Sequence, residues 1–520
     1  MDMRGRLAAL VAGMSLLAST AGMAAGAAPD QVTIKDGALK GAVDGQVVSF
    51  KNIPFAAPPV GPLRWKPPQK EAPWTGVRDA TAFGPTCMQV TGAFGRPGGQ
   101  ASEDCLQLNV YEPVEHAHKK LPVMVWIYGG GFIGGAASYY NGAHFADDGV
   151  VLVTVNYRLG RLGWFAHPGL TKEAGGGPTG DFGLMDQIAA LKWVKANIGA
   201  FGGDASNVTV FGESAGAMSV NYLLISPQAR GLFQKAISES GFGRTPGRTL
   251  AGAEALGADF AKANGVTGDD AAQIAALRAL PADTLMKAAA GLDAPDAPGP
   301  IVDGVLVPTT VAQAFAAGKQ AHVPFILGGN SYEASLFPRL RAHPEATLDP
   351  LGDKKAGAIA LFGDGDPVRA ATTIWTEGAI IEPDRYLARQ EVKAGVKAYV
   401  YYFSYMPAGL RQIAPGTPHG GEIGYVFETL PTTAMKRGGM TIPAANGEDH
   451  ALSAHIHAYW VAFAKTGSPD SAGGPEWPAY TPANDAAIEF GADGVVVHDQ
   501  FRKAQLDIIE QVAERRAAGQ

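Results

Sequence analysis

The chain has 520 residues, of which 46% are hydrophobic and 18% charged, and its formal net charge is −7. This composition is that of a globular protein with a large core, and the 68 glycines indicate many tight turns rather than disorder. The acidic balance argues against nucleic acid or an anionic membrane as the partner, because both require clustered Lys and Arg. We therefore expect a small-molecule partner, while the oligomeric state has no signal in the sequence.

The first 27 residues are predicted to be a signal peptide. Arg4 and Arg6 precede an apolar run over residues 7–21, and the Ala-Gly-Ala sequence at residues 25–27 is a cleavage signal. A membrane anchor is the alternative, but the run is shorter than the roughly 20 residues that span a bilayer. We expect an exported protein, periplasmic or extracellular, without a membrane anchor.

Apolar, β-branched runs alternate with helical patterns along the rest of the chain. Helical patterns cover residues 183–198 and 215–225. The runs expected to form buried strands are residues 123–128, 150–156, 208–211, 236–238, 323–327 and 396–403. This order predicts an α/β fold with a mixed, mainly parallel sheet and helices on both faces.

No linker divides the mature chain, so residues 28–520 are predicted to form a single domain. Its Ala-rich part from Leu250 to about Leu292 has helical spacing. We interpret this part as a helical insertion, at about residues 243–292, against the top edge of the sheet and over the active site.

The strongest chemical signal is the sequence from Phe211 to Ser219, in which Gly212, Ser214 and Gly216 match the G-x-S-x-G nucleophile elbow. In that motif a strained turn between a strand and a helix exposes the serine hydroxyl. The match alone is weak in a chain this rich in glycine. A strand-like run precedes it and a helical run follows it, as the motif requires, so Ser214 is the predicted nucleophile.

A serine nucleophile needs donors for the oxyanion that forms during attack. Gly129, Gly130 and Gly131 follow an apolar strand and offer unobstructed N–H groups, and Ala215 adds a donor at the positive end of the next helix. A flexible glycine turn is the plainer alternative.

Cys87 and Cys105 are the two cysteines of the chain. An oxidising compartment would allow them to close a Gly-rich segment as a disulfide, and two buried thiols are the alternative. Two cysteines exclude a zinc-ribbon or iron–sulfur framework. The pairs His116/His118 and His455/His457 lack carboxylate or Cys partners at ligand spacings, so we expect surface or packing histidines and no metal site.

Nearly all of the mature chain resembles the type-B carboxylesterases, the family of cholinesterases and bacterial para-nitrobenzyl-type esterases. Besides the elbow and the triple glycine, the matching segments are Ile53-Pro54-Phe55-Ala56, Pro59-Val60-Gly61-Pro62-Leu63-Arg64, Glu103-Asp104-Cys105-Leu106, Asn156-Tyr157-Arg158, Gly183-Leu184-Met185-Asp186-Gln187, Phe201-Gly202-Gly203-Asp204, Trp460, Phe463-Ala464 and Gly467-Ser468-Pro469. The resemblance implies an α/β-hydrolase fold, no cofactor, oxyanion donors at Gly130, Gly131 and Ala215, and a disulfide between Cys87 and Cys105.

The resemblance also assigns the partners of Ser214. Glu333 matches the family's acid, although Tyr332 and Ala334 replace the Asp and Gly that usually flank it. His419 lies in a segment that closely resembles the family's catalytic-histidine segment. Other histidines, among them His450, His455, His457 and His498, also follow Glu333, so the local match and not the order selects His419. The order Ser, acid, His is that of α/β-hydrolases.

These residues predict acyl-enzyme chemistry. Neutral His419 accepts the proton of Ser214 during attack on the ester carbonyl, and Glu333 orients and stabilises the imidazole. Because free histidine has a pKa near 6.5, we expect activity to fall below about pH 6.

Some aromatic side chains are candidates for an acyl or alcohol pocket, with a plain core position as the alternative: Phe132, Trp164, Phe242 and Phe427. Glu213 and Ser240 match positions near the family's active site, where a structural role is at least as well supported. The segment between the cysteines contains no Trp, unlike that of cholinesterases, which disfavours recognition of choline by cation–π contact.

Two other functions share parts of this signature. A non-catalytic cholinesterase-like binding protein is disfavoured because Ser214, Glu333 and His419 are all present. An amide, carbamate or lactone hydrolase, or an acyltransferase, would use the same residues and needs a substrate panel to be distinguished.

Overall fold

The computed structural model describes residues 30–89, 100–115, 120–287, 294, 296–411, 414–437, 440–470 and 473–517. The predicted signal peptide, residues 1–27, lies outside the described residues, as do His116 and His118. Within the described ranges, no helix is long and apolar enough to cross a membrane, and no three His, Cys, Asp or Glu side chains are grouped to hold a metal ion.

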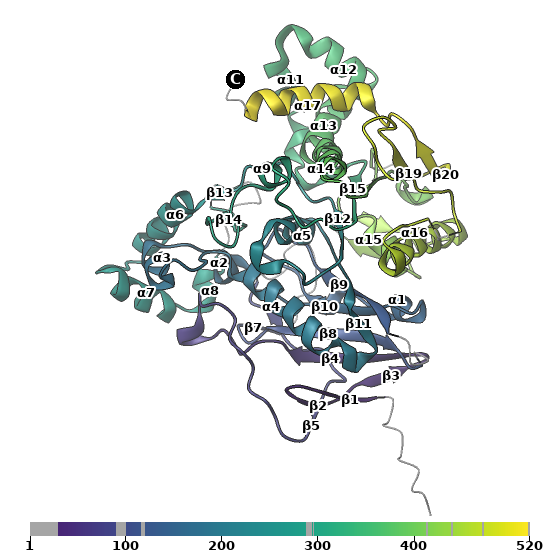
Figure 1. The fold of residues 1–520 in the computed structure, drawn as a ribbon. Helices are drawn as coiled ribbons and strands as arrows, with labels where there is room; N and C mark the ends of the chain where they lie inside the picture. Colours follow the sequence, from purple (N-terminus) through teal and green to yellow (C-terminus); the bar gives the residue numbers. More distant parts are fainter. Residues whose placement is uncertain are drawn as a thin grey trace, which may run out of the picture.

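A single large sheet forms the centre of the molecule (Figure 1). Its eleven described strands, in spatial order, are β20 (Gly494–His498), β19 (Ala487–Gly491), β16 (Ala398–Phe403), β15 (Phe325–Asn330), β12 (Lys235–Glu239), β11 (Gly203–Glu213), β9 (Leu121–Ile127), β10 (Val151–Val155), β8 (Gln107–Pro113), β4 (Val47–Pro54) and β3 (Ala42–Asp44). Strands β19 to β10 are parallel, and antiparallel strands flank them at both edges. All six predicted strand runs lie in this parallel part.

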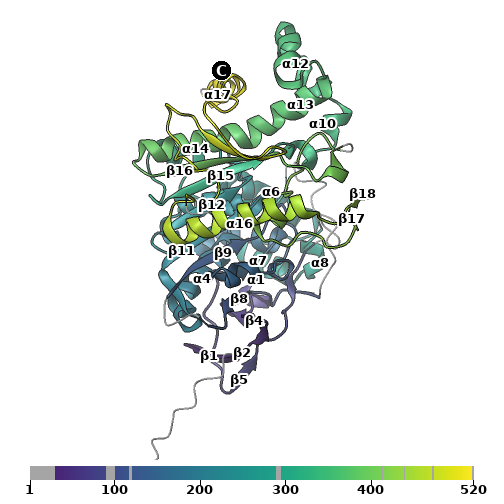
Figure 2. The same ribbon diagram turned by 90° about the vertical axis from the view of Figure 1, so that its right-hand side faces the viewer.

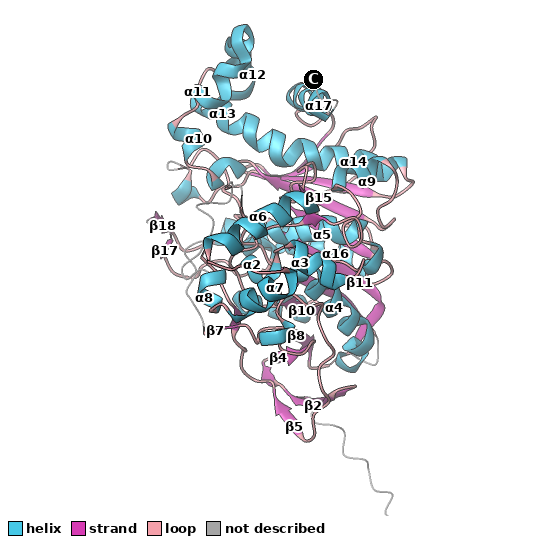
Figure 3. Cartoon of the chain, turned by 90° about the vertical axis from the view of Figure 1, so that its left-hand side faces the viewer, coloured by secondary structure: helices cyan, strands magenta, loops and turns pink. Residues whose placement is uncertain are grey.

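Helices cover both faces of the sheet. Helices α4 (Phe182–Asn197), α5 (Ala215–Ile225) and α14 (Glu382–Lys393) lie on one face (Figure 3), and α1 (Ala143–Asp147) and α16 (Gly447–Thr466) lie on the other (Figure 2). Because both faces are covered, every residue of β10, β12, β15 and β16 is buried, which explains why β10 and β16 are mainly apolar. The predicted mixed, mainly parallel α/β fold is confirmed.

The Ala-rich stretch after β12 is helical where it is described. It forms α6 (Leu250–Ala263), α7 (Asp270–Ala279) and α8 (Ala282–Leu285), while residues 288–293 lie outside the described part. The side-chain oxygens of Thr249 and Asp269 accept hydrogen bonds from the first turns of α6 and α7. These helices pack beside α2 (Gly160–Gly163) and α3 (Pro168–Ala174) at one end of the sheet (Figure 1).

Shorter elements complete the chain. The other strands are β1 (Gln31–Ile34), β2 (Gly37–Lys40), β5 (Val77–Asp79), β6 (Thr86–Cys87), β7 (Ala101–Ser102), β13 (Arg248–Thr249), β14 (Ile301–Val302), β17 (Met435–Arg437) and β18 (Met440–Ile442). The other α-helices are α9 (Val311–Ala316), α10 (Arg339–Ala342), α11 (Glu345–Leu348), α12 (Lys355–Gly363), α13 (Pro367–Thr376), α15 (Ile423–Val426) and α17 (Lys503–Ala517). Buried Arg385 ties α17 to the rest of the fold through ion pairs with Asp485, Asp507 and Glu510.

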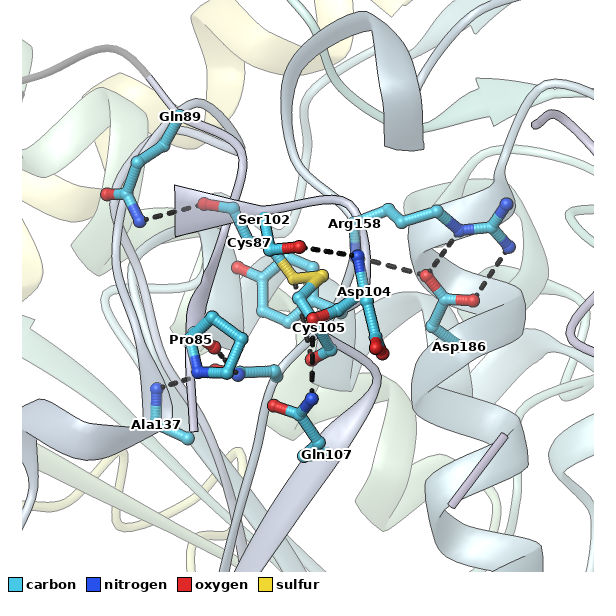
Figure 4. Close-up of a disulfide and its surroundings, with 12 residues drawn as sticks. Pro85, Cys87, Gln89, Ser102, Asp104, Cys105, Gln107, Ala137, Arg158 and Asp186 are labelled. Atoms are coloured by element: carbon cyan, nitrogen blue, oxygen red, sulfur yellow. Dashed lines mark hydrogen bonds and ion pairs between the residues drawn. A yellow bond between two sulfur atoms is a disulfide. The ribbon is translucent and has the colours of Figure 1, made fainter. Parts of the chain in front are cut away.

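Cys87 and Cys105 form the disulfide that the family resemblance implied (Figure 4). Their Cα atoms are 5.0 Å apart, and both residues are buried. Asp186 on α4 lies near this disulfide and forms a buried, two-pronged ion pair with Arg158, at 2.7 and 2.8 Å. Burial raises the pKa of Asp186 and the guanidinium of Arg158 opposes that rise. The family segments that contain Arg158 and Asp186 therefore have a structural role here.

Removing the disulfide is expected to lower the free energy of unfolding by about 3 kcal/mol, because an 18-residue separation constrains the unfolded chain by about that amount. The change is the double substitution Cys87→Ala with Cys105→Ala. Urea unfolding, followed by circular dichroism, measures the difference. Wild-type protein treated with a reductant is the control and should match the variant, whereas an unchanged unfolding midpoint would contradict the prediction.

His455 and His457, on α16, agree with the expectation of surface and packing histidines. His455 is exposed. His457 is buried against the ring of Phe145, and its Nδ1 atom lies 2.7 Å from the carbonyl oxygen of Val426.

Candidate active site

Ser214 occupies the turn between β11 and α5, as the elbow motif predicts. Its φ of 56° lies in the left-handed region, which non-glycine residues rarely adopt. The amide of Ser214 donates a hydrogen bond to the carbonyl of Glu239 on the adjacent strand, at 2.9 Å. This contact fixes the strained turn at the carboxyl end of the sheet, and the side chain of Ser214 remains partly exposed.

The two glycines of the elbow are required by the backbone of β9. A Cβ atom on Gly216 would lie 1.9 Å from the carbonyl oxygen of Ile127, and one on Gly212 would lie 2.5 Å from the same oxygen. Both distances are far below van der Waals contact. Side chains at these two positions would therefore collide with the end of β9.

The triple glycine lies directly beside the nucleophile. A Cβ atom on Gly129 would lie 2.9 Å from the Cβ atom of Ser214. Gly130 and Gly131 have φ values of 117° and 60°, which side chains disfavour. Within the described part of the chain, no backbone hydrogen bond uses the N–H of either residue. Ala215 begins α5, and the first N–H groups of a helix lack acceptors within the helix.

Glu333 follows β15 and is completely buried. One carboxylate oxygen accepts hydrogen bonds from the hydroxyl of Ser240, at 2.5 Å, and from the amide of Asn330, at 2.6 Å. The other oxygen contacts Nδ1 of His419. Ser240, which the sequence placed near the site with an uncertain role, thus orients the carboxylate of Glu333.

Backbone and serine contacts hold the Glu333 and His419 segments together. The amide of Tyr332 donates to the carbonyl of Thr417, at 2.9 Å, and the amide of Thr417 donates to the hydroxyl of Ser331, at 2.8 Å. The amide of His419 donates to the hydroxyl of Ser335, at 2.9 Å. Residues 86 apart in the sequence therefore form one compact unit.

The other edge of the imidazole faces the elbow, but its contact differs from the expected one. Nε2 of His419 lies 3.0 Å from Oε1 of Glu213, the residue that precedes Ser214. The contacts formed among the described residues do not include a hydrogen bond between His419 and Ser214, although Ser214 is expected to give its proton to this imidazole. His419 therefore lies between two carboxylates, with the nucleophile adjacent in the chain to one of them.

These carboxylates determine the proton affinity of the imidazole. Burial alone would lower the pKa of His419, but the negative charges of Glu213, Glu333 and Glu422 outweigh it and raise the pKa from 6.5 to about 9. Sequence reasoning missed Glu422, whose Oε2 accepts a hydrogen bond from the side-chain amide of Asn330, at 2.5 Å. Glu422 lies in the segment that resembles the family's catalytic-histidine segment, but no role was expected for it.

Comparison with known proteins decides the family. Residues 28–355 and 365–509 match the family described as "Carboxylesterase family". The chain belongs to this carboxylesterase family. The enzyme is 38% identical over 467 residues to a fumonisin B1 esterase of Sphingopyxis macrogoltabida, covering 86% of this chain and 84% of the relative. It is 37% identical over 473 residues to a para-nitrobenzyl esterase of Bacillus subtilis, covering 86% and 92%.

A solved structure supports the same conclusion. The carboxylesterase superimposes on a PNB esterase with a TM-score of 0.76 and 33% identity, over 92% of this chain and 100% of that one. The predicted α/β-hydrolase fold and the predicted carboxylic-ester hydrolase activity are thereby confirmed.

The four predicted pocket residues lie in three separate places. The ring of Phe242 lies 6.3 Å from that of His419, whereas Phe132 packs on Trp164 at 4.5 Å. Trp164 also lines a separate cavity of about 280 Å³ beside α6. Phe427 is buried among the core rings Trp126, Tyr140, Phe145 and Phe211, so its ring belongs to the core, as the alternative interpretation had it.

Two aromatic side chains that the sequence did not single out extend from Phe242. Trp375 on α13 lies 6.3 Å from Phe242, and Phe337 lies 4.9 Å from Trp375, both measured between ring centres. These rings bring α13 and the segment after Glu333 next to the histidine. Neither residue has a local sequence signal, because α13 is distant in sequence from the elbow and from His419.

A mainly apolar cavity of about 620 Å³ borders the other side of the His419 segment. Pro418, Gly420 and Gly421 form one wall. The remaining walls come from tyrosine and aliphatic side chains, among them Tyr139, Tyr140, Leu410, Ile423 and Leu430. A cavity of this size and character is typical of sites that bind small, largely apolar molecules.

Proposed function

We propose that this carboxylesterase hydrolyses esters through an acyl-enzyme on Ser214, with His419 as general base and Glu333 as the acid that orients it. The observation that carries the proposal is the buried contact of Glu333 with Nδ1 of His419, whose other imidazole edge faces the elbow that bears Ser214. A carboxylate that orients an imidazole beside a strained serine is the arrangement of serine hydrolases.

The reaction then has two halves. Nε2 of His419 accepts the hydroxyl proton as Ser214 Oγ bonds to the ester carbonyl carbon, and the same proton goes to the departing alcohol when the carbon–oxygen bond breaks. Water attacks the acyl-enzyme, gives its proton to His419, and the acid leaves as Ser214 is restored. The N–H groups of Gly130, Gly131 and Ala215 are the proposed donors to the oxyanion in both halves.

The substrate is proposed to be a small-molecule ester with an apolar portion. The cavity of about 620 Å³ bordered by Pro418 and Gly420, and the rings of Phe242 and Trp375, support this choice. We further propose an exported enzyme, cleaved after residue 27, whose mature residues 28–520 form one domain with a helical insertion at about residues 243–292. The described helices α6, α7 and α8 support the insertion.

Hydrolysis of para-nitrophenyl esters of graded acyl length, with and without an organophosphate, tests the proposal. We expect turnover, stoichiometric inhibition, and a labelled peptide that carries the phosphoryl group on Ser214. Fumonisin B1 belongs in the panel of substrates because a 38% identical relative is a fumonisin B1 esterase. An amide and a lactone that match one of the esters show whether the enzyme prefers ester bonds to other acyl bonds. A label on another residue would refute the assignment.

On the acid side of the pH profile, activity should fall at a higher pH than the pKa of a free histidine. His419 must be neutral to accept a proton, so activity is present above its pKa and is lost as the pH falls through it. Since the surrounding carboxylates raise the pKa of His419 to about 9, the loss of activity toward low pH should have its midpoint above pH 6.5. This is higher than the value of about pH 6 expected from the sequence. Measurement of kcat/KM against pH checks this, and a midpoint at or below pH 6.5 would contradict it.

A further inference from the structure

The turn that carries two of the proposed oxyanion donors has almost no side chains to hold it in place. We call residues 129–135 the glycine turn, since five of its seven residues are glycine. Glycine has the greatest backbone freedom of all residues. Oxyanion donors are effective only when they are held in position before the reaction begins. The glycine turn therefore needs restraints from other parts of the chain.

The end of the glycine turn packs directly on its beginning. The carbonyl of Gly130 accepts hydrogen bonds from the amides of Ile133 and Gly134, both at 3.1 Å. A Cβ atom on Gly130 would lie 2.1 Å from the carbonyl oxygen of Gly134. One on Gly135 would lie 2.7 Å from the carbonyl oxygen of Gly129. Because these backbone atoms are in contact, a restraint on Gly135 also restrains Gly130.

The side chain of Gln89 provides a restraint of this kind. Its amide oxygen accepts a hydrogen bond from the N–H of Gly135, and its NH₂ group donates one to the carbonyl of Gly135, both at 3.0 Å. The N–H and the carbonyl of one residue belong to two successive peptide groups. The primary amide of glutamine offers a donor and an acceptor together, so Gln89 holds both peptide groups of Gly135.

The disulfide fixes the position of Gln89 itself. Gln89 follows Cys87 by two residues, and its NH₂ group also donates to the carbonyl of Cys87, at 3.1 Å (Figure 4). Cys87 is bonded to Cys105, which directly precedes the strand β8 of the central sheet. The glycine turn is thus tied, through Gln89 and the disulfide, to a rigid part of the fold.

We propose that Gln89 is a positioning residue for the oxyanion donors. It holds Gly135, and through the packed ends of the glycine turn it keeps the N–H groups of Gly130 and Gly131 where the oxyanion forms. Gln89 acts through the turn and not by contact with the substrate. This inference rests on the proposed function, in which these N–H groups bind the oxyanion.

Gln89→Met tests the role, because methionine keeps the length of the side chain and removes both hydrogen bonds to Gly135. A displacement of the donors by about 1 Å weakens their hold on the transition state, so kcat should fall by about 10-fold to 100-fold. KM should stay within about twofold, since the donors act mainly on the transition state.

An aryl trifluoromethyl ketone reports on the oxyanion donors directly. Ser214 Oγ bonds to the ketone carbon, the hydroxyl proton passes to His419, and the ketone oxygen becomes an oxyanion facing the donors. Such an analogue of the transition state should lose affinity for Gln89→Met by the same factor as kcat. An unchanged affinity for the ketone would overturn the proposal.

A merely structural role of Gln89 would give a different result. Partial unfolding lowers the number of active sites, which titration with an organophosphonate counts. The enzyme that remains folded would then bind the ketone as tightly as wild type does. Fewer active sites with wild-type affinity would therefore also overturn the proposal, whereas a full count of active sites with weakened affinity supports it.

Gln107→Met is the matched control. Gln107 follows Cys105 by two residues, as Gln89 follows Cys87, and it lies on the other side of the disulfide (Figure 4). Within the described ranges, its side-chain NH₂ group donates to the carbonyl of Asp104, at 3.3 Å, and not to the glycine turn. This variant should keep the kcat and the ketone affinity of wild type. Losses equal to those of Gln89→Met would show that any change beside the disulfide impairs the enzyme, and would overturn the specific role.

Amide hydrogen exchange gives a measurement that does not depend on catalysis. The peptide that contains the glycine turn should exchange faster in Gln89→Met than in wild type, because the N–H of Gly135 loses its acceptor. Equal exchange would overturn the proposal, and Gln89→Ala replaces the methionine variant if that variant does not fold. Wild-type enzyme that neither binds the ketone nor is labelled by the organophosphonate would refute the role of Ser214, while the exchange rates would still decide whether Gln89 holds the turn.

Discussion

Replacing Ser214 by Ala is expected to lower kcat by about 10⁶-fold, the loss seen when a serine hydrolase loses its nucleophile. No hydroxyl remains to form the acyl-enzyme, and the oxyanion donors alone sustain only residual hydrolysis. Substrate binding should change little, because the substitution removes one oxygen from a partly exposed turn. The measurements are kcat with a para-nitrophenyl ester and the pre-steady-state burst, which should disappear.

Ser226→Ala is the control for this substitution. Ser226 is a buried serine at the other end of α5, and its hydroxyl has no hydrogen-bond partner in the described part of the chain. Its replacement tests whether removal of any serine from this helix impairs the enzyme. Comparable losses in both variants, or near-normal turnover in Ser214→Ala, would show that the nucleophile lies elsewhere.

Replacing Glu333 by Gln should lower kcat by about 10⁴-fold with a smaller change in KM. The amide preserves the volume, but it no longer stabilises the imidazolium and can favour the wrong tautomer of His419. The measurement is a full kinetic comparison with wild type, together with the unfolding midpoint to show that the fold persists.

The variant to compare with Glu333→Gln is Glu213→Gln, since Oε1 of Glu213 lies 3.0 Å from the opposite edge of the same imidazole. If Glu333 is the orienting acid, its replacement should cost more in kcat than that of Glu213. The reverse order would transfer the orienting role to Glu213. Tyr332 and Ala334, which depart from the family pattern, do not disturb the carboxylate: both are buried, and Ala334 donates its amide to the hydroxyl of Thr376, at 3.2 Å.

The central part of the fold was predictable because its signals are local. Strands such as β10 are buried throughout and apolar except for one threonine, and the helical pattern that begins at Ala215 ends at Ile225, as observed. The short strands near the amino-terminal end were not predicted: β1 and β2, which form a small sheet with β5, and β3 at the edge of the large sheet. Strands β1 to β3 span three or four residues with mixed exposure, and runs that short have no distinct periodicity.

Of the site, sequence motifs identified the residues at strand ends and missed those that approach through tertiary packing. Glu239 is an ordinary residue at the end of a strand until α16 buries it, and Trp375 becomes part of the site only because α13 packs against the Glu333 segment. Phe427 shows that nearness in sequence does not place a residue in the site. This aromatic residue is close to His419 in sequence, yet its ring points into the core.

The serine contacts between the Glu333 and His419 segments fix the relative position of the acid and the base. That position does not depend on the length of the chain that connects the two segments. Ser331 and Ser335 hold the two segments together directly, while α10 to α14 and β16 lie in the intervening chain. Evolution or a designer can therefore lengthen, shorten or exchange parts of that intervening chain to reshape the substrate entrance. The contact between Glu333 and His419 will be retained while the substrate specificity changes.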